Sequence, residues 1–189
     1  MTRIVALAGL ILALPVACFA QDVGAYKVLS TTKTSTMQKE MQEAASAGFR
    51  YGAVMGGETA VGGKEVVVVM QKLGASNAKY EYRLLATNKT STMQKEMQEA
   101  ADAGFQYAGQ TVFESLVGGK EVVCILEKDP STTPVKYQYR LLATSKTSTM
   151  EKELNEAAAG SYEIVGMTVA KTAVGGKELV TIARRKVAP

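Results

Sequence analysis

One thirteen-residue block occurs three times in the sequence, and this repetition limits what the chain can fold into. KTSTMQKEMQEAA begins at Lys33 and recurs unchanged at Lys89, and KTSTMEKELNEAA begins at Lys146. A second marker, VGGKE, recurs at the same two offsets of 56 and 57 residues, beginning at Val61, Val117 and Val174. Two markers that agree indicate tandem units with almost no internal insertion. The predicted repeats are residues 26–72, 80–128 and 137–185, joined by the turn-rich connectors 73–79 and 129–136.

Each repeat predicts the order strand, helix, strand, strand. In the second repeat, the aromatic and aliphatic segment 80–87 predicts the first strand. The repeated block predicts a helix, because its apolar residues form a single stripe at helical spacing. We expect the methionines of that stripe to lie in the core rather than to bind a metal. Segment 105–117 predicts a second strand, interrupted or twisted around its glycine and polar residues, and segment 121–128 predicts a third.

Short signals mark the ends of these elements. A serine followed three residues later by Gln or Glu indicates a capping box at each helix start, at Ser35/Gln38, Ser91/Gln94 and Ser148/Glu151. Gly48 and Gly104 supply the left-handed residue that ends a helix. In the third repeat the glycine is Gly160, so we expect that helix to end one residue earlier. Gly118-Gly119 indicates a two-residue hairpin turn.

The predicted fold class is α+β, with three tandem β-α-β-β repeats, each a three-stranded, mainly antiparallel sheet with one helix on one face. Segment 121–128 is apolar on both faces for about five residues, which is typical of a central strand covered on both sides. A unit of about 50 residues is at the margin of independent stability. We therefore expect the units to pack together, in either a pseudo-threefold or a stacked arrangement.

The first 20 residues have the pattern of a secretory signal peptide. Arg3 precedes the apolar run 4–14, and Pro15 is followed by a small-residue stretch that ends at Ala20, where we expect cleavage. A membrane anchor is one alternative, but the run is shorter than the roughly 20 apolar residues that span a bilayer. Lipidation of Cys18 is another, although Pro15 stands where such signals usually have an aliphatic residue. We predict a periplasmic or secreted protein whose mature chain has no transmembrane segment.

Two residue types that carry much protein chemistry are scarce. The chain has no histidine, and removal of the leader leaves Cys124 as the sole cysteine. These absences exclude an internal disulfide, Ser-His-Asp or Cys-His catalysis, and thiolate-rich or histidine-based metal sites. We expect no cofactor or metal. The formal net charge of +4 is mild and does not indicate nucleic-acid binding. Cys124 aligns with Val68 and Thr181, which favours a half-buried strand residue over a reactive or dimerising thiol.

The third repeat carries a family resemblance. It reads YQYRLLA, then KELNEAAAGSYEIVGMTV, then KELVTIARR. It resembles a family of short bacterial domains of unknown function that open with an aromatic strand, carry LN..A..GYE.V after a helix and close on a basic residue. The positions that carry the resemblance are Leu154, Gly160, Tyr162, Ile164, Val165 and Arg185. The family commonly has Trp where this chain has Phe49, Phe105 and Tyr162. The resemblance implies a β-α-β-β domain, and it carries over no catalytic or binding residue.

The polar residues that open each predicted helix are the candidate binding residues. Unpaired amides and the helix dipole attract anions at a helix N-terminus, so the ligand would be a phosphate, a sulfate or an acidic glycan. Helix capping and solubility are the alternative role. The residues are Lys33, Ser35 and Thr36, then Lys89, Ser91 and Thr92, then Lys146, Ser148 and Thr149. The tyrosines that open the first strands form either a sugar-binding surface or strand-end packing; they are Tyr26, Tyr82 and Tyr139.

Threefold repetition without a usable catalytic set favours a non-enzymatic binding or structural module of the cell envelope. Linked weak sites bind more tightly than one site, and an exposed sheet edge can accept a partner strand. The partner would be an envelope protein or an anionic glycan. The alternative is a hydrolase or lyase that uses lysine and carboxylate groups, for instance Lys33 with Glu40. Other repeated charges indicate ordinary surface pairs, such as Lys152 with Glu156 and the hairpin pair Lys64-Glu65.

Overall fold

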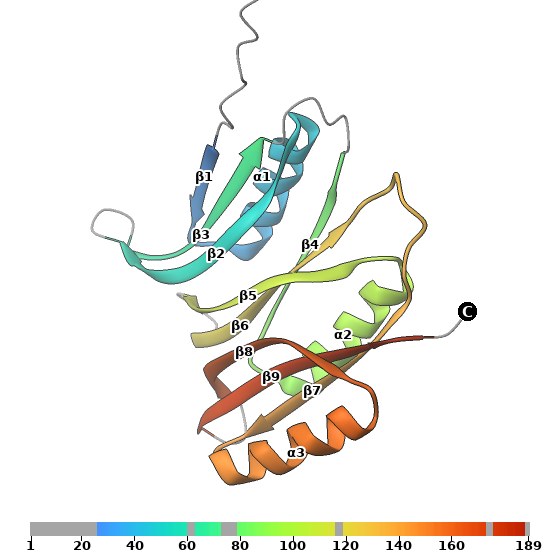
Figure 1. The fold of residues 1–189 in the computed structure, drawn as a ribbon. Coiled ribbons are helices and arrows are strands. Elements are labelled where there is room, and N and C mark those ends of the chain that lie inside the picture. Colours follow the sequence, from blue (N-terminus) through green and yellow to red (C-terminus); the bar gives the residue numbers. More distant parts are fainter. Residues whose placement is uncertain (1–25, 60–62, 73–78, 116–118, 173–175, 188–189) are drawn as a thin grey trace, which may run out of the picture.

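A computed structural model describes residues 26–59, 63–72, 79–115, 119–172 and 176–187 (Figure 1). The first unit contains β1 (Tyr26–Thr31), α1 (Thr34–Ser46), β2 (Phe49–Thr59) and β3 (Gly63–Lys72). The second contains β4 (Glu81–Thr87), α2 (Thr90–Asp102), β5 (Gln106–Ser115) and β6 (Gly119–Lys128). The third contains β7 (Tyr137–Thr144), α3 (Thr147–Ala159), β8 (Glu163–Thr172) and β9 (Gly176–Lys186). The predicted α+β class and the β-α-β-β order are confirmed.

The three sheets have the same topology. In each unit the last strand is central, giving the orders β1-β3-β2, β4-β6-β5 and β7-β9-β8, and all pairs are antiparallel. The second strand of every unit contains a one-residue bulge, at Gly52, Ala108 and Val165. A bulge leaves one residue out of the ladder and bends the strand. The irregularity predicted for segment 105–117 is therefore present in all three units.

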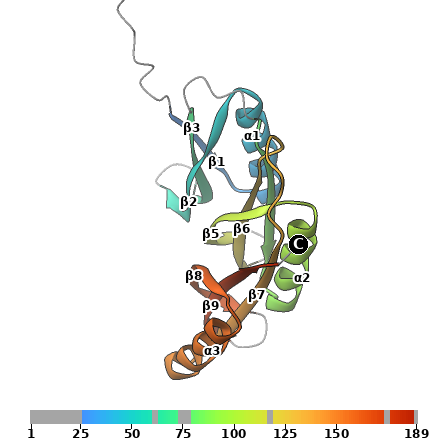
Figure 2. The same ribbon diagram turned by 45° about the vertical axis from the view of Figure 1, so that its right-hand side comes forward.

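The units form a stack in which sheets and helices alternate. Helix α1 lies between the first and second sheets, and α2 lies between the second and third (Figures 1 and 2). One apolar core joins Met37 and Met41 of α1 to Val123 and Ile125 of the second sheet. A second core likewise joins Met93 and Met97 of α2 to Val180 and Ile182 of the third sheet. The packing of units against one another is confirmed, and its arrangement is stacked.

The central strands show where this stacking ends. Val123 and Ile125 of β6 are fully buried under α1, whereas the equivalent Val67 and Val69 of β3 are half-buried. No helix of the described residues precedes the first sheet, so its outer face is uncovered. The prediction of a central strand covered on both faces therefore holds for the second and third units and is wrong for the first.

The predicted capping boxes are wrong. Each helix begins at the threonine before the serine, and its N-cap residue is a lysine, Lys33, Lys89 or Lys146, with no side-chain capping hydrogen bond. The turn before the helix is closed instead by the threonine that ends the first strand. In the first unit, the N–H of Lys33 donates to Thr31 Oγ1 over 3.2 Å, and Thr87 and Thr144 act likewise. The chain consequently enters the helix two residues earlier than the serine pattern predicts, since the N-cap is Lys33 rather than Ser35.

The helix ends keep one geometry in all three units. Gly48 and Gly104 have φ of 86° and 90°, which confirms the predicted left-handed residues. In the third unit Ser161 takes this position, with φ of 62°. Helix α3 has the same length as α1 and α2, 13 residues. The N–H of Ser161 donates to Ala158 over 2.9 Å, as Gly48 and Gly104 do to their own helices. The prediction of an earlier end is wrong, because serine rather than Gly160 occupies the left-handed position.

The hairpins are longer than predicted. Thr59 pairs with Gly63, Ser115 with Gly119, and Thr172 with Gly176, so the second glycine belongs to the strand rather than to a two-residue turn. The turn residues themselves lie outside the described residues. The predicted signal peptide, its cleavage site and Cys18 also lie outside them. Within the described ranges, no helix has the length and apolar character needed to cross a membrane.

Candidate functional site

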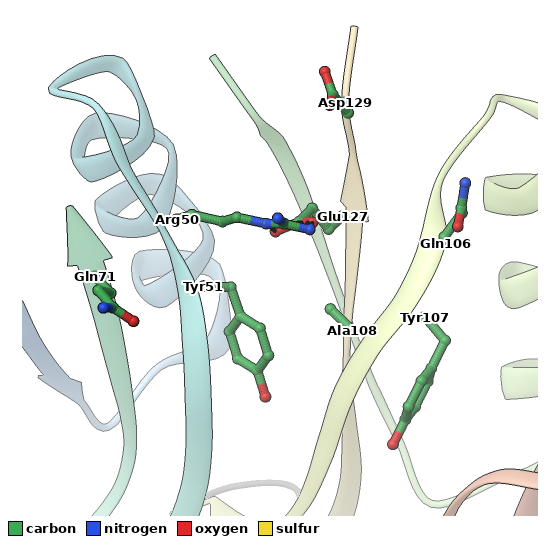
Figure 3. Close-up of a pocket in the computed structure, with 8 residues that line it drawn as sticks. All are labelled: Arg50, Tyr51, Gln71, Gln106, Tyr107, Ala108, Glu127 and Asp129. Carbon is green, nitrogen blue, oxygen red and sulfur yellow. Dashed lines mark hydrogen bonds and ion pairs between the residues drawn. The ribbon is translucent and has the colours of Figure 1, made fainter. Parts of the chain in front are cut away.

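A polar cleft of about 450 Å³ lies between the first and second units (Figure 3). Its walls come from the beginnings of β2 and β5 and the ends of β3 and β6. The lining residues are Arg50, Tyr51, Gln71, Gln106, Tyr107, Ala108, Glu127 and Asp129. None of them was a candidate site residue from the sequence. Most of the side chains that line the cleft carry hydrogen-bonding groups.

The cleft exists because β2 and β5 meet at one end and separate at the other. At the far end of β2, the N–H of Gly56 donates to Thr111 Oγ1 over 2.7 Å. A side chain at Gly56 would collide with the backbone carbonyl of Val112, so only glycine allows this approach. Towards their first residues the two strands separate, and polar side chains fill part of the gap.

An ion pair between two units crosses the floor of the cleft. Arg50 extends from β2 to Glu127 on β6, with Nη2 at 2.7 Å and Nε at 3.0 Å from Oε1 (Figure 3). The Tyr82 hydroxyl donates to the other oxygen of Glu127 over 2.9 Å, and the Arg50 guanidinium lies 4.4 Å from the Tyr80 ring centroid. The hydrogen bond to Glu127 raises the pKa of Arg50. Both charges are therefore neutralised and held in place by protein groups.

Two tyrosines line the cleft but direct their hydroxyls to neighbouring units. A methyl group at Gly109 would collide with the Tyr51 hydroxyl, and one at Gly166 would collide with the Tyr107 hydroxyl. Each ring thus lies over a glycine of the following unit. Burial raises the pKa of Tyr51 and of Tyr107, so both phenols stay protonated at neutral pH. They can act as hydrogen-bonding and stacking groups but are poorly suited to act as bases.

The remaining groups give the cleft its binding chemistry. Gln71 and Gln106 contribute amides that both donate and accept, and Asp129 contributes an acceptor. Hydrogen bonds from the Ser131 hydroxyl and N–H lower the pKa of Asp129, which is therefore ionised at neutral pH. Within the described part of the chain, no three His, Cys, Asp or Glu side chains are grouped to hold a metal ion. The arrangement suits a neutral, hydroxyl-rich or amide-rich ligand.

The structure leaves the nine predicted anion-binding residues at three separate helix starts, one in each unit. Their lysines and serines are exposed, and Thr36, Thr92 and Thr149 are half-buried. The cavity beside the first turn of α2 measures about 10 Å³ and is lined largely by apolar side chains. That volume is close to the minimum for one water molecule and is too small for a phosphate. Anion binding at the exposed side of these helix starts stays a prediction.

Sequence reasoning missed the glutamines that join one unit to the next. Gln38 Oε1 accepts from the N–H of Leu84 over 2.8 Å. Gln42 accepts from the N–H of Tyr82 and donates to the Tyr80 carbonyl, each over 3.1 Å. Both glutamines lie along the outer edge of β4, where the strand has backbone groups that no other strand pairs. We call such a pair of helix glutamines the glutamine clamp.

The second interface repeats the glutamine clamp. Gln94 accepts from the N–H of Leu141 over 2.7 Å and donates to the Tyr139 carbonyl over 2.6 Å. Gln98 accepts from the N–H of Tyr139 and donates to the Tyr137 carbonyl, over 3.1 and 3.2 Å. The third helix, which belongs to the last described unit, has Glu151 and Asn155 at these positions. That substitution in the last repeat was the available signal for an inter-unit role.

Of the two roles left open for the tyrosines that begin the first strands, packing rather than a sugar-binding surface holds for two of the three. Tyr82 and Tyr139 are buried at the interfaces, and their hydroxyls accept from the N–H groups of Tyr51 and Tyr107, each over 2.7 Å. Those N–H groups belong to residues next to the bulges, so the bulge frees a donor for the next unit. Burial raises the pKa of both tyrosines. Tyr26, which belongs to the first described unit, is exposed.

Other expectations about single residues are met. The stripe methionines Met37, Met41, Met93, Met97 and Met150 are buried, as is Cys124, which is more completely enclosed than predicted. The predicted helix-surface pairs are present, including Lys152 with Glu156 at 3.9 Å. Lys64 is a hairpin residue that also pairs with Glu114 of the next unit at 3.1 Å. Among the described ion pairs none joins Lys33 to Glu40, so the proposed lysine and carboxylate chemistry has no contact to support it.

Comparison of the chain with protein-family models, with curated proteins and with solved structures gives no match. The assignment of a function to the cleft therefore depends on its geometry and chemistry alone.

Proposed function

We propose that the mature chain is a non-enzymatic binding module of the cell envelope, and that the cleft between β2 and β5 holds its ligand. The observation that carries this proposal is the fixed position of the lining groups. Arg50 and Glu127 are held by each other and by Tyr82, and the two tyrosine rings rest on the neighbouring strands. A cleft formed by two docked units is already shaped before a ligand arrives, which lowers the entropy that binding must overcome.

The ligand class follows from the charges in the cleft. Its lining contains one cation and two carboxylates, and the cation is paired with one of them. An anionic glycan would approach the ionised Asp129 without a free cation to bind, so a neutral saccharide chain is the better match. Amide groups can donate to and accept from sugar hydroxyls, and tyrosine rings offer flat apolar faces. The predicted export of the chain supports an envelope saccharide as the source.

An enzymatic function has less support. Catalytic groups usually have pKa values shifted towards neutrality, and here burial moves the tyrosine pKa values away from it. The single carboxylate in close contact with a cation is committed to an ion pair between units. The resemblance to short domains of unknown function implies a β-α-β-β domain alone and stays a prediction.

The proposal is tested by titrating isotope-labelled protein, residues 21–189, with neutral and acidic oligosaccharides and following amide shifts by NMR. We expect saturable shifts at the cleft with neutral sugars. Gln71→Ala and Gln106→Ala should each weaken binding about tenfold, the effect of one to two lost hydrogen bonds. Gln138→Ala, on the β7 strand away from the cleft, is the matched control and should leave affinity unchanged. Saturable binding that ignores Gln71 and Gln106 would contradict the proposal, as would an absence of binding across the panel.

A further inference from the structure

The exposed apolar side chains of the strands gather at the two ends of the stack. Six large apolar residues on described strands are 55–67% exposed. Three belong to the first unit and three to the third: Tyr26, Val28 and Met55, then Ile164, Met167 and Val169. The second unit, which has a neighbour on each side, contributes none in its described strands. An exposed apolar patch of this kind marks an interaction surface.

The uncovered face of the first sheet corresponds to surfaces that are buried in the other two units. Tyr26 is 67% exposed, whereas its equivalents Tyr82 and Tyr139 are 4% and 2% exposed. In the second and third units, this face and the adjacent strand edge receive the helix of the preceding unit. The first sheet therefore presents one half of an interface that the chain already forms twice.

The last unit presents the other half of the same interface. Leu154 and Ala158 of α3 align with Met97 and Ala101 of α2, which are buried against the third sheet. No sheet of a further unit follows α3 in the described residues, and Leu154 is half-buried and Ala158 exposed. Ile164 of β8 aligns with Tyr107 of β5, whose side chain covers Gly166 of the next unit. The Ile164 side chain is 55% exposed.

We propose that a second copy of this chain occupies these surfaces, with α3 and β8 of one protomer packed against β1 and the outer face of the first sheet of the next. The stack would then continue from copy to copy in the geometry that relates successive units within one chain. Because the two contacting surfaces differ, this interface is heterologous, and it produces open fibres or rings rather than isolated dimers.

The glutamine clamp is incomplete at this junction, which sets the strength of the association. Glu151 can accept from the Val28 N–H but cannot donate to the Tyr26 carbonyl, and Asn155 is one methylene shorter than the Gln98 with which it aligns. The contact between copies is therefore weaker than the contact between units, and assembly is reversible and dependent on concentration. Adjacent copies would be held mainly by apolar burial.

Sedimentation velocity from micromolar to millimolar concentration tests the proposal, with each end blocked in turn. Val28→Glu blocks the first end and Met167→Glu blocks the last, both at exposed positions where the fold tolerates charge. We expect the wild-type mass to grow with concentration and each variant to remain monomeric. An equimolar mixture of the two variants retains one competent end of each kind, so it should form two-chain species and no larger ones.

A second variant asks whether α3 makes the contact. Glu151→Gln with Asn155→Gln restores the glutamine clamp and should raise the association constant about tenfold or more, because each recovered hydrogen bond is worth a factor of about two to ten. Wild-type and restored chains that both stay monomeric at millimolar concentration would refute the proposal, since the ends then serve another partner. Dimers formed by Met167→Glu alone would also refute it, because they would show the first ends pairing with each other. None of these results depends on the cleft or its ligand.

Discussion

Replacing Gln94 by glutamate should separate the clamp role of this residue from the capping role that its sequence context predicts. Gln94 makes two hydrogen bonds to β7, one as acceptor and one as donor. Glutamate keeps the acceptor for the Leu141 N–H but turns a carboxylate oxygen towards the Tyr139 carbonyl. A glutamate three residues after Ser91 also satisfies the capping-box pattern as well as glutamine does. The two roles therefore predict opposite results for one substitution.

The expected magnitude follows from the lost donor. Removing one hydrogen bond costs about 1 kcal/mol, and leaving a partly buried carbonyl unpaired adds about 1–3 kcal/mol. We expect Gln94→Glu to lower the free energy of unfolding by about 2–4 kcal/mol. The matched control is Glu151→Gln, the reverse exchange at the aligned position of α3, the helix of the last described unit. That control should lie within about 0.5 kcal/mol of the wild type, as surface substitutions usually do.

Urea unfolding followed by circular dichroism measures both variants in dilute solution, where chains do not associate. Because stacked units are coupled mainly through their interfaces, weakening one interface should also separate the third unit's transition from that of the first two. Equal stability of Gln94→Glu and Glu151→Gln would refute the clamp. It would mean that the hydrogen bonds to β7 are replaced by water without loss.

Three further substitutions test other features of the stack. Gly56→Ala should lower the unfolding free energy by about 2–4 kcal/mol, because its Cβ would collide with the Val112 backbone. The control is Gly57→Ala, whose Cβ would have no atom nearby. Equal effects of the two substitutions in urea unfolding would contradict the close approach. Ser161→Gly should raise the unfolding free energy by about 0.5–1 kcal/mol, since serine has a left-handed φ there, and an unchanged urea midpoint would argue against strain. The Cys124 thiol, whose pKa burial raises to about 12, should react with a maleimide at neutral pH only after denaturation, and rapid labelling of the native chain would show that β6 is accessible.

Local patterns account for what the sequence predicted correctly. The methionine stripe, the left-handed glycines and the apolar third strand each form a pattern within a few consecutive residues, so a short window contains the information even where the contacts extend to another unit. Predictions from the same short segments are wrong where a side chain forms its hydrogen bonds with another unit. Gln38 fits a capping box by spacing, yet its partner Leu84 lies 46 residues further along the chain. Local rules cannot distinguish these two uses of one glutamine.

The cleft could not be predicted because its charged positions change from unit to unit. The position of Arg50 holds Gln106 in the second repeat and Glu163 in the third, which looks like random drift when the repeats are aligned. In three dimensions Arg50 pairs with Glu127 of the following unit, whereas Glu163, in the last described unit, pairs with Arg184 of its own unit at 2.7 Å. The pairing is therefore recognised only when a position in one unit is compared with its contact position in the next unit.

Differences among the three repeats thus have a physical cause. Three features are present in all three units: the first buried methionine of the helix, the strand bulge and the left-handed residue after the helix. The side chains that join one unit to the next are replaced in the third unit. Tyrosine covers glycine at Tyr51 over Gly109 and at Tyr107 over Gly166, but Ile164 has no glycine to cover. The glutamine clamp likewise lapses only in α3. Gln38, Gln42 and Tyr51, which the second repeat keeps and the third replaces, all face the next unit, whereas Ser161 replaces Gly48 and Gly104 at a helix end within its own unit.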